Sequence, residues 1–115
     1  KASCEFPVAM MTAVATYEDI DPAELRRRVS DRDAAVIDVR EPWEYERGHV
    51  PGATLIPMGE IPRRIDEIPD GAVLVCASGN RSGYACAWLA EQGKEGLANL
   101  AGGTQGWILH GFDVE

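Results

Sequence analysis

The fold is decided by the stretch Val73-Leu74-Val75-Cys76-Ala77-Ser78-Gly79-Asn80-Arg81-Ser82. It begins as an apolar run of strand length and passes directly into a helix-like segment. A strand that enters a helix through so short a loop is typical of an α/β protein. Cys76 closes the strand, so its thiol is expected at the start of the helix. Unpaired backbone N–H groups and the positive end of the helix dipole favour the thiolate there, which is the nucleophilic form of cysteine.

Residues 76–82 form the cysteine loop. The sequence of this loop is suited to binding an anion. Backbone N–H groups at a helix start bind sulfonates and phosphates, and Arg81 would add a charged donor. A cation is unfavourable at a helix N-terminus unless an anion is present, which favours anion binding over an ordinary surface role for Arg81. Ser82 is expected to act as a helix cap rather than in catalysis. The predicted substrate-binding residues are Ala77, Ser78, Gly79, Asn80, Arg81 and Ser82.

The chain has three cysteines, and only Cys76 is predicted to be reactive. Its alternative role is that of a small buried apolar residue, but the polar, glycine-containing loop that follows favours a nucleophile. Cys4 lies in the N-terminal segment and Cys86 lies among alanines within a predicted helix, so both are expected to be inert. The odd number of cysteines and the absence of a CxxC spacing argue against a disulfide framework and a zinc site. A cytoplasmic, reducing environment is therefore expected.

Strands and helices alternate along the rest of the chain. Strands are predicted at residues 34–39, 53–56, 73–76 and 97–100, and helices at 22–29, 41–47, 61–68, 82–92 and 104–110. This alternation predicts a parallel sheet with helices on both faces. Ligands of such sheets bind at the carboxyl ends of the strands, where Cys76 ends one strand and Asp38-Val39-Arg40 ends another.

Asp38 and Arg40 are predicted to form a hydrogen-bonded support under the cysteine loop, with Glu41 or Glu44 as partner for Arg40. His49 is expected to be a turn histidine bonded to the backbone, because a thiolate at a helix start needs no general base.

Length and charge restrict the function further. A chain of 115 residues forms one domain, and its net charge of −8 argues against nucleic acid or an anionic membrane as the main partner. No stretch is long enough to cross a membrane, and no exposed apolar stripe is evident, so a monomer is expected. The chain begins at Lys1, and we expect residues 1–15 to be an engineered or processed remnant or a disordered segment, with the domain at residues 16–115.

Three motifs together make the chain recognisable from about Tyr17 to its end. They are Asp38-Val39-Arg40-Glu41 with Glu44 and Gly48-His49-Val50-Pro51-Gly52-Ala53; the cysteine loop; and Leu100-Ala101-Gly102-Gly103 with Gly106-Trp107. In this order and spacing they resemble a single-domain rhodanese of the thiosulfate sulfurtransferase family. The resemblance implies a five-stranded parallel sheet flanked by helices, and an enzyme that needs no metal or organic cofactor.

The resemblance also implies a double-displacement reaction. Cys76 would attack the outer sulfur of thiosulfate or a similar small anionic donor, release sulfite and keep a persulfide. Cyanide or a cellular thiol would then take this sulfur, and a protein is a further candidate acceptor. The N–H groups of residues 77–81 would hold the persulfide, and Arg81 would hold the sulfonate. Many family members carry a cationic or bulky residue where this chain has Ala77, which leaves the donor open.

Two other classes of function remain as alternatives. Dual-specificity phosphatases have a related fold, but five residues separate their cysteine and arginine, whereas four separate Cys76 and Arg81. A phosphoryl group needs the larger loop, and arsenate reduction on this scaffold would be expected to need it too. The other alternative is a noncatalytic rhodanese-like interaction module. Such modules often lack the cysteine that this chain keeps.

Overall fold

The computed structural model describes residues 16–115 of the chain. The predictions for residues 1–15 and Cys4 lie outside the described residues. Strands are β1 (Glu18–Ile20), β2 (Val36–Asp38), β3 (Thr54–Leu55), β4 (Val73–Val75) and β5 (Ala98–Leu100). Helices are α2 (Pro22–Ser30), α3 (Pro42–Glu46), α4 (Asn80–Glu91) and α5 (Gly103–Leu109), with 3₁₀ turns η1 (Met58–Glu60) and η2 (Pro62–Glu67). Among residues 16–115, no helix has the length and apolar character required to span a membrane.

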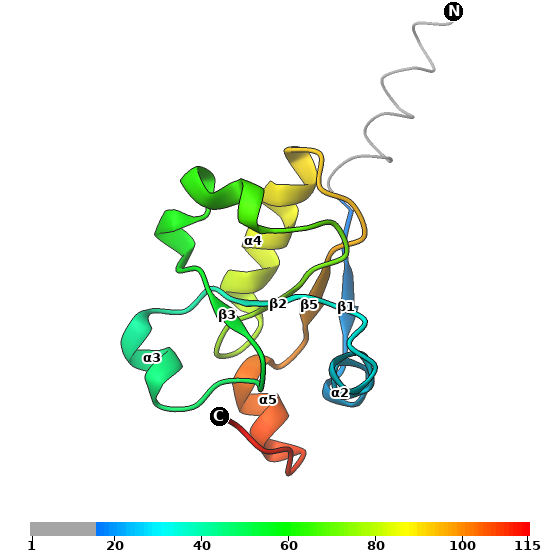
Figure 1. The fold of residues 1–115 in the computed structure, drawn as a ribbon, viewed down its shortest axis with the longest axis vertical. Coiled ribbons are helices and arrows are strands. Elements are labelled where there is room, and N and C mark those ends of the chain that lie inside the picture. Colours follow the sequence, from blue (N-terminus) through cyan, green and yellow to red (C-terminus); the bar gives the residue numbers. More distant parts are fainter. Residues whose placement is uncertain (1–15) are drawn as a thin grey trace, which may run out of the picture.

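All five strands form one parallel sheet in the order β1-β5-β4-β2-β3, so the predicted α/β architecture is confirmed (Figure 1). The central strand β4 is apolar throughout because both faces of the sheet are covered. Side chains alternate between the faces, so Leu74 and Val75 of β4 enter separate cores.

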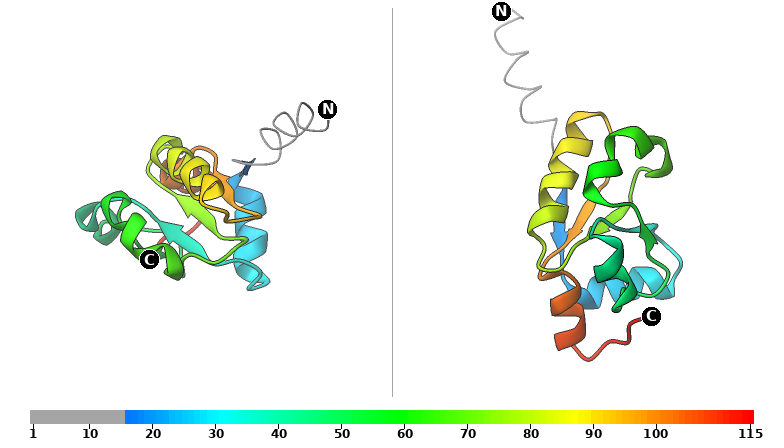
Figure 2. Two further views of the ribbon diagram at one scale, coloured as in Figure 1. Left: turned by 90° about the horizontal axis from the view of Figure 1, so that it is seen from above. Right: turned by 90° about the vertical axis from the view of Figure 1, so that its left-hand side faces the viewer.

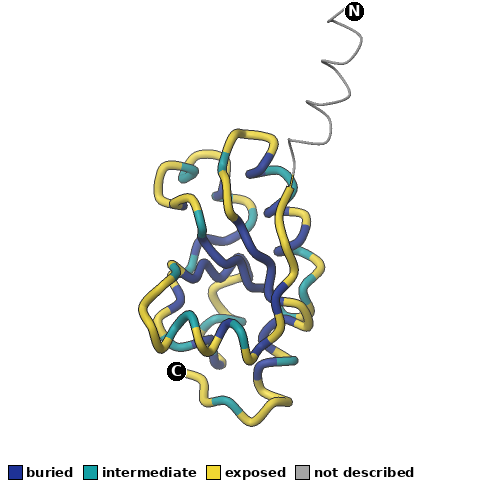
Figure 3. The backbone as a smooth tube through the Cα atoms, turned by 90° about the vertical axis from the view of Figure 1, so that its right-hand side faces the viewer, coloured by how far each residue is buried: buried dark blue, intermediate teal, exposed yellow. Residues whose placement is uncertain are grey.

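The two cores differ in the helices that close them (Figure 2). The first core packs Leu74 and Cys76 against α4 and the 3₁₀ turns, chiefly through Leu89 and Ile61. The second core packs β4 and β5 against Leu25 of α2 and Trp107 of α5, among others. The buried backbone therefore runs through the middle of the molecule, and the covering helices present their outer sides to solvent (Figure 3).

Three predicted elements need correction. Strand β1 was missed because it is only three residues long and its one buried residue is Ile20. The predicted helix at 61–68 consists of 3₁₀ turns, in which Arg64 leaves helical geometry. Helix α4 begins at Asn80, two residues before the predicted start, because Gly79 adopts a left-handed conformation with φ 102°.

The sequence Asp21-Pro22-Ala23-Glu24 is typical of a helix start with a capping box. Asp21 caps α2 through a hydrogen bond from the backbone N–H of Glu24. The carboxylate of Glu24 does not reach back to the cap, because it accepts hydrogen bonds from Arg27 and Arg28. The charged groups one turn away along the helix thus outcompete the capping-box contact.

Candidate active site

The cysteine loop leaves the carboxyl end of β4 beside the end of β2. The backbone N–H of Val39 donates to Val75 at 2.9 Å, which places the Asp38–Arg40 segment next to Cys76 at the same sheet edge. The loop then turns at Gly79. A Cβ at Gly79 would lie 3.2 Å from both the Gly102 nitrogen and the Leu100 carbonyl oxygen, so only glycine fits between these backbones without a shift.

The Cys76 thiol is buried and surrounded by hydrogen-bond donors. Its Sγ accepts a hydrogen bond from the Gly79 N–H at 3.1 Å and one from the Ser82 hydroxyl at 3.3 Å. Burial raises the pKa of this thiol, but hydrogen bonds from the Ser82 hydroxyl and from the N–H groups of Ser82, Ser78 and Gly79 outweigh burial and lower it below its ordinary value. The loop therefore stabilises a thiolate, as the sequence predicts for a cysteine at a helix start.

The orientation of these N–H groups depends on α5. Its first N–H groups donate to the loop carbonyls, from Thr104 to Cys76 at 2.8 Å and from Gln105 to Ala77 at 3.0 Å. A trans peptide directs its C=O and N–H in opposite directions. Holding the Ala77 carbonyl toward α5 therefore turns the Ser78 N–H toward the sulfur. Gly103 makes this approach possible, since a Cβ there would collide with the backbone of Cys76 and Ala77.

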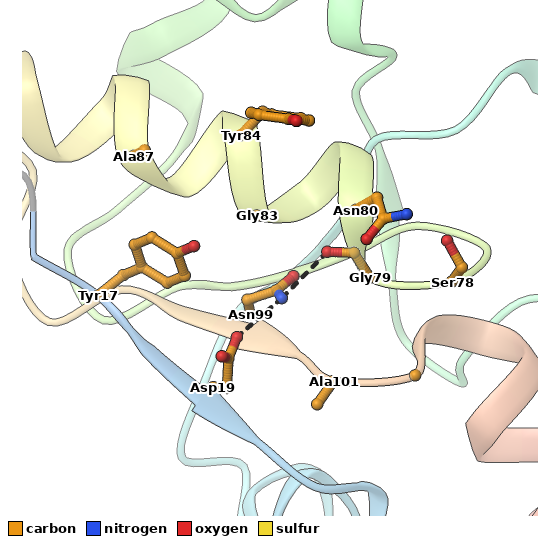
Figure 4. Close-up of a pocket in the computed structure, with 11 residues that line it drawn as sticks. Tyr17, Asp19, Ser78, Gly79, Asn80, Gly83, Tyr84, Ala87, Asn99 and Ala101 are labelled. Atoms are coloured by element: carbon orange, nitrogen blue, oxygen red, sulfur yellow. Dashed lines mark hydrogen bonds between the residues drawn. The ribbon is translucent and has the colours of Figure 1, made fainter.

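A polar cluster formed by Ser82, Asn99 and Asp19 holds the loop from the other side. The amide nitrogen of Asn99 donates to Asp19 at 3.0 Å and to the Gly79 carbonyl at 3.1 Å (Figure 4). Its amide oxygen accepts from the buried Ser82 hydroxyl. Sequence reasoning gave Ser82 a capping and a substrate-binding role and missed Asn99 and Asp19. The capping prediction is wrong, because Gly79 is the N-cap of α4 and Ser82 lies within the helix. A polar residue inside the buried run of β5 was the signal that could have found Asn99.

Asp38 and Arg40 are hydrogen-bonded to each other as predicted, but Arg81 and Arg40 have further partners that differ from prediction. Arg81 was expected to be available to an anion, but its two terminal nitrogens donate to the two carboxylate oxygens of Glu44, each at 2.9 Å. Arg40 does not pair with Glu41 or Glu44. It donates to Asp38 at 2.8 to 3.1 Å and to the Gly48 carbonyl at 2.8 Å. This buried pair fastens the segment after α3 to the end of β2.

The remaining candidate groups are structural. His49 bonds through Nδ1 to the Tyr45 carbonyl at 2.9 Å and stacks on the Tyr45 ring, which agrees with the expected turn role. Cys86 lies in the core, and burial raises the pKa of its thiol to about 12. Within residues 16–115, no three His, Cys, Asp or Glu side chains gather into a potential metal site.

Two hollows border the cysteine loop. The larger, of about 540 Å³, lies between Tyr17 and Tyr84 and reaches the outer side of residues 78–80, including the exposed Asn80 (Figure 4). The smaller, of about 250 Å³, lies beside Ala77, and Trp43 and Glu44 are among its lining residues. The loop is thus bordered by open space on both sides.

The fold and the site define the class: an α/β protein with a buried cysteine of lowered pKa at the carboxyl edge of a five-stranded parallel sheet. Comparison with known proteins identifies the family. Residues 21–110 match the model of the rhodanese-like domain. The chain therefore belongs to the rhodanese-like domain family.

Its relatives include sulfurtransferases. A protein named sulfurtransferase from Allochromatium vinosum is 40% identical over 84% of this chain and 92% of its own length. The thiosulfate sulfurtransferase GlpE of Pseudoalteromonas translucida is 28% identical over 79% of this chain and 89% of its own. Among solved structures, a rhodanese-related protein from Thermoplasma volcanium superposes with a TM-score of 0.76 at 29% identity, covering 86% of this chain and 98% of that one.

Proposed function

We propose that this protein is a sulfurtransferase that carries sulfur as a persulfide on Cys76. The observation that carries the proposal is the set of donors around Sγ, where the Gly79 N–H and the Ser82 hydroxyl converge on a thiol of lowered pKa. The loop supplies both requirements of sulfur transfer: a thiolate to attack, and N–H groups to stabilise the negative outer sulfur of the persulfide.

In the first half-reaction the Cys76 thiolate attacks the outer sulfur of a donor such as thiosulfate. A bond forms between Sγ and that sulfur, while the bond to the sulfonate sulfur breaks and its electron pair leaves with sulfite. In the second half-reaction a thiolate or cyanide attacks the outer sulfur of the persulfide. The bond to Sγ breaks, its electron pair returns to Cys76, and the acceptor departs as a persulfide or thiocyanate. Each step is a displacement at sulfur, in the manner of thiol–disulfide exchange.

The role of Arg81 in this reaction depends on Glu44. A donor sulfonate would take Arg81 as its charged partner, as expected from the sequence, but it must compete with the two hydrogen bonds of the Glu44 carboxylate. Residues 77–81 supply the remaining donors. Asp38 and Arg40 support the adjoining segment and do not enter the chemistry.

Phosphate or arsenate chemistry on the same fold is the second candidate, and the length of the loop argues against it. Only four residues separate Cys76 from Arg81. Gly79 and Ser82 already contact Sγ directly, which leaves a small space around the sulfur for a tetrahedral oxyanion.

The experiment that tests the proposal is mass spectrometry of the protein after incubation with thiosulfate or an organic persulfide. We expect one added sulfur atom on the peptide that contains Cys76, and its removal by cyanide with formation of thiocyanate. Cys76→Ser is expected to abolish both, whereas Cys86→Ser keeps the persulfide. Transfer by the Cys76→Ser variant, or efficient hydrolysis of an aryl phosphate by the wild type, would contradict the proposal.

A further inference from the structure

The ion pair between Arg81 and Glu44 joins α4 to α3 at the rim of the cysteine loop. Both carboxylate oxygens of Glu44 accept from Arg81 at 2.9 Å, a bidentate arrangement that satisfies the guanidinium fork. The Glu44 side chain is only 13% exposed, against 40% for Arg81. A further hydrogen bond holds the Glu44 side chain in place, because its carboxylate accepts from the Glu41 N–H at 3.0 Å at the start of α3.

Glu44 is a carboxylate throughout the physiological pH range. The hydrogen bonds from Arg81 lower its pKa to about 2, against the opposing effect of burial. The positive charge of Arg81 is therefore matched by a negative charge whenever the site is empty. Arg40, a buried cation near the loop, is matched in the same way by Asp38.

These pairs make the site a poor receptor for a highly charged anion. An anion that takes Arg81 must separate it from Glu44, and it leaves behind a largely buried carboxylate that has lost its cation. The net charge of −8 adds no attraction from a distance. Ala77 supplies no replacement cation beside Cys76.

We infer that Glu44 is a specificity-determining residue that disfavours dianionic thiosulfate and favours organic persulfides or polysulfides with one negative charge or none. The inference rests on the proposed function of Cys76. With a persulfide R–S–SH, the Cys76 thiolate attacks the outer sulfur and the S–S bond breaks. The electron pair leaves on R–S⁻, and the proton stays on the outer sulfur that is now bound to Cys76. No sulfonate has to displace Glu44 in this step.

The test uses two alkylating reagents that differ in charge, neutral iodoacetamide and anionic iodoacetate. Their rates at the Cys76 peptide are measured by mass spectrometry at one pH, and the ratio cancels any change in the thiolate fraction. Glu44→Gln keeps the hydrogen-bonding shape but frees the charge of Arg81. We expect it to raise the iodoacetate-to-iodoacetamide ratio about tenfold, since a hydrogen bond to a charged group is worth at least that factor.

Glu46→Gln is the matched control, because Glu46 lies on the same short helix, is exposed and has the same charge. We expect it to leave the ratio unchanged. Arg47, which also lines the hollow, is present in every variant and cancels in the comparison. Adding Arg81→Ala to Glu44→Gln is expected to return the ratio to the wild-type value. An unchanged ratio in Glu44→Gln would overturn the inference even if the protein transfers sulfur.

The same variants are then compared as sulfur acceptors. We expect Glu44→Gln to accelerate persulfide formation from thiosulfate about tenfold and to change the rate from an organic persulfide R–S–SH, with no charged group in R, less than twofold. If the iodoacetate-to-iodoacetamide ratio rises but neither donor forms a persulfide on Cys76, both the proposed function and the proposed donor preference are wrong. If both donors load Cys76 equally in the two proteins, the proposed function stands and the inference about Glu44 fails.

Discussion

The hydroxyl of Ser82 lies 3.3 Å from the sulfur of Cys76 and also bonds to the side-chain oxygen of Asn99. A serine hydroxyl carries a single proton, so it donates to one of these acceptors at a time. Asn99 is the acceptor when Cys76 is a neutral thiol, and the sulfur competes for the proton when it becomes negative. Rotation of the Ser82 hydroxyl alone can therefore adjust the hydrogen bonding of the loop to the charge of the sulfur.

Removing this hydroxyl should make Cys76 a weaker acid. Ser82→Ala is expected to raise the pKa of Cys76 by about one pH unit, because a hydrogen bond to a charged group contributes roughly that much. The rate of alkylation by iodoacetamide against pH measures it, and its midpoint should move to higher pH. Ser78→Ala is the control, since it retains the backbone N–H near the sulfur. Equal midpoints for Ser82→Ala and wild type would show that the hydroxyl does not stabilise the thiolate.

Asn99 is expected to matter for both stability and reactivity. Asn99→Leu has a similar volume but leaves the Gly79 carbonyl without its side-chain donor and the Ser82 hydroxyl with only the Cys76 sulfur as acceptor, which costs about 2 kcal/mol of unfolding free energy. Urea unfolding measures the loss. Asp19→Asn serves as control, because an amide oxygen can still accept from Asn99, and it should cost far less. A fully stable Asn99→Leu protein would contradict this account of the cluster.

Gly103 should tolerate no side chain. Gly103→Ala combines a positive φ of 61° with a collision against the backbone of Cys76 and Ala77, so we expect a loss of about 3 kcal/mol or more. Gly111→Ala is the matched control, since Gly111 also has a positive φ but nothing lies within 4 Å of the added carbon. It should cost only about 1 kcal/mol for the backbone conformation. Thermal or urea unfolding of both variants separates the two effects, and equal losses would remove the collision as a cause.

The pair of Asp38 and Arg40 should be the costliest ion pair to break. Both side chains are buried, so Asp38→Asn leaves a buried guanidinium without its countercharge and is expected to cost about 3–5 kcal/mol. Asp31→Asn, which breaks an exposed pair with Arg27, is expected to cost less than about 1 kcal/mol. Urea unfolding of the two variants provides the comparison. A loss for Asp38→Asn as small as that for Asp31→Asn would contradict the supporting role.

The sequence pattern was sufficient for four of the five strands and for the cysteine loop, because these depend on local patterns. A run of apolar residues that ends in Cys76 and continues into a glycine-containing helix start can be read without tertiary information. Strand β1 could not be found in this way, since Glu18 and Asp19 are exposed and the strand exists through pairing with β5. Its place depends on residues 80 positions away.

The pairing of charges was also beyond local reasoning. Arg81 and Glu44 are 37 residues apart, and only the packing of α3 beside α4 decides that Glu44 meets Arg81 rather than Arg40. Asn99 gave a readable signal, a polar residue in a buried strand. Its partners Ser82 and Asp19 come from two further elements, so its role became clear only in the folded chain.

The contact between α5 and the cysteine loop has a consequence for how the protein is made. The carbonyl groups of Cys76 and Ala77 are turned by N–H groups of Thr104 and Gln105, which are synthesised almost thirty residues later. Until that last helix has docked, the thiol lacks part of the environment that lowers its pKa and behaves as an ordinary cysteine. The lowered pKa of Cys76 therefore depends on contacts that the chain can form only after residues 104 and 105 have been added.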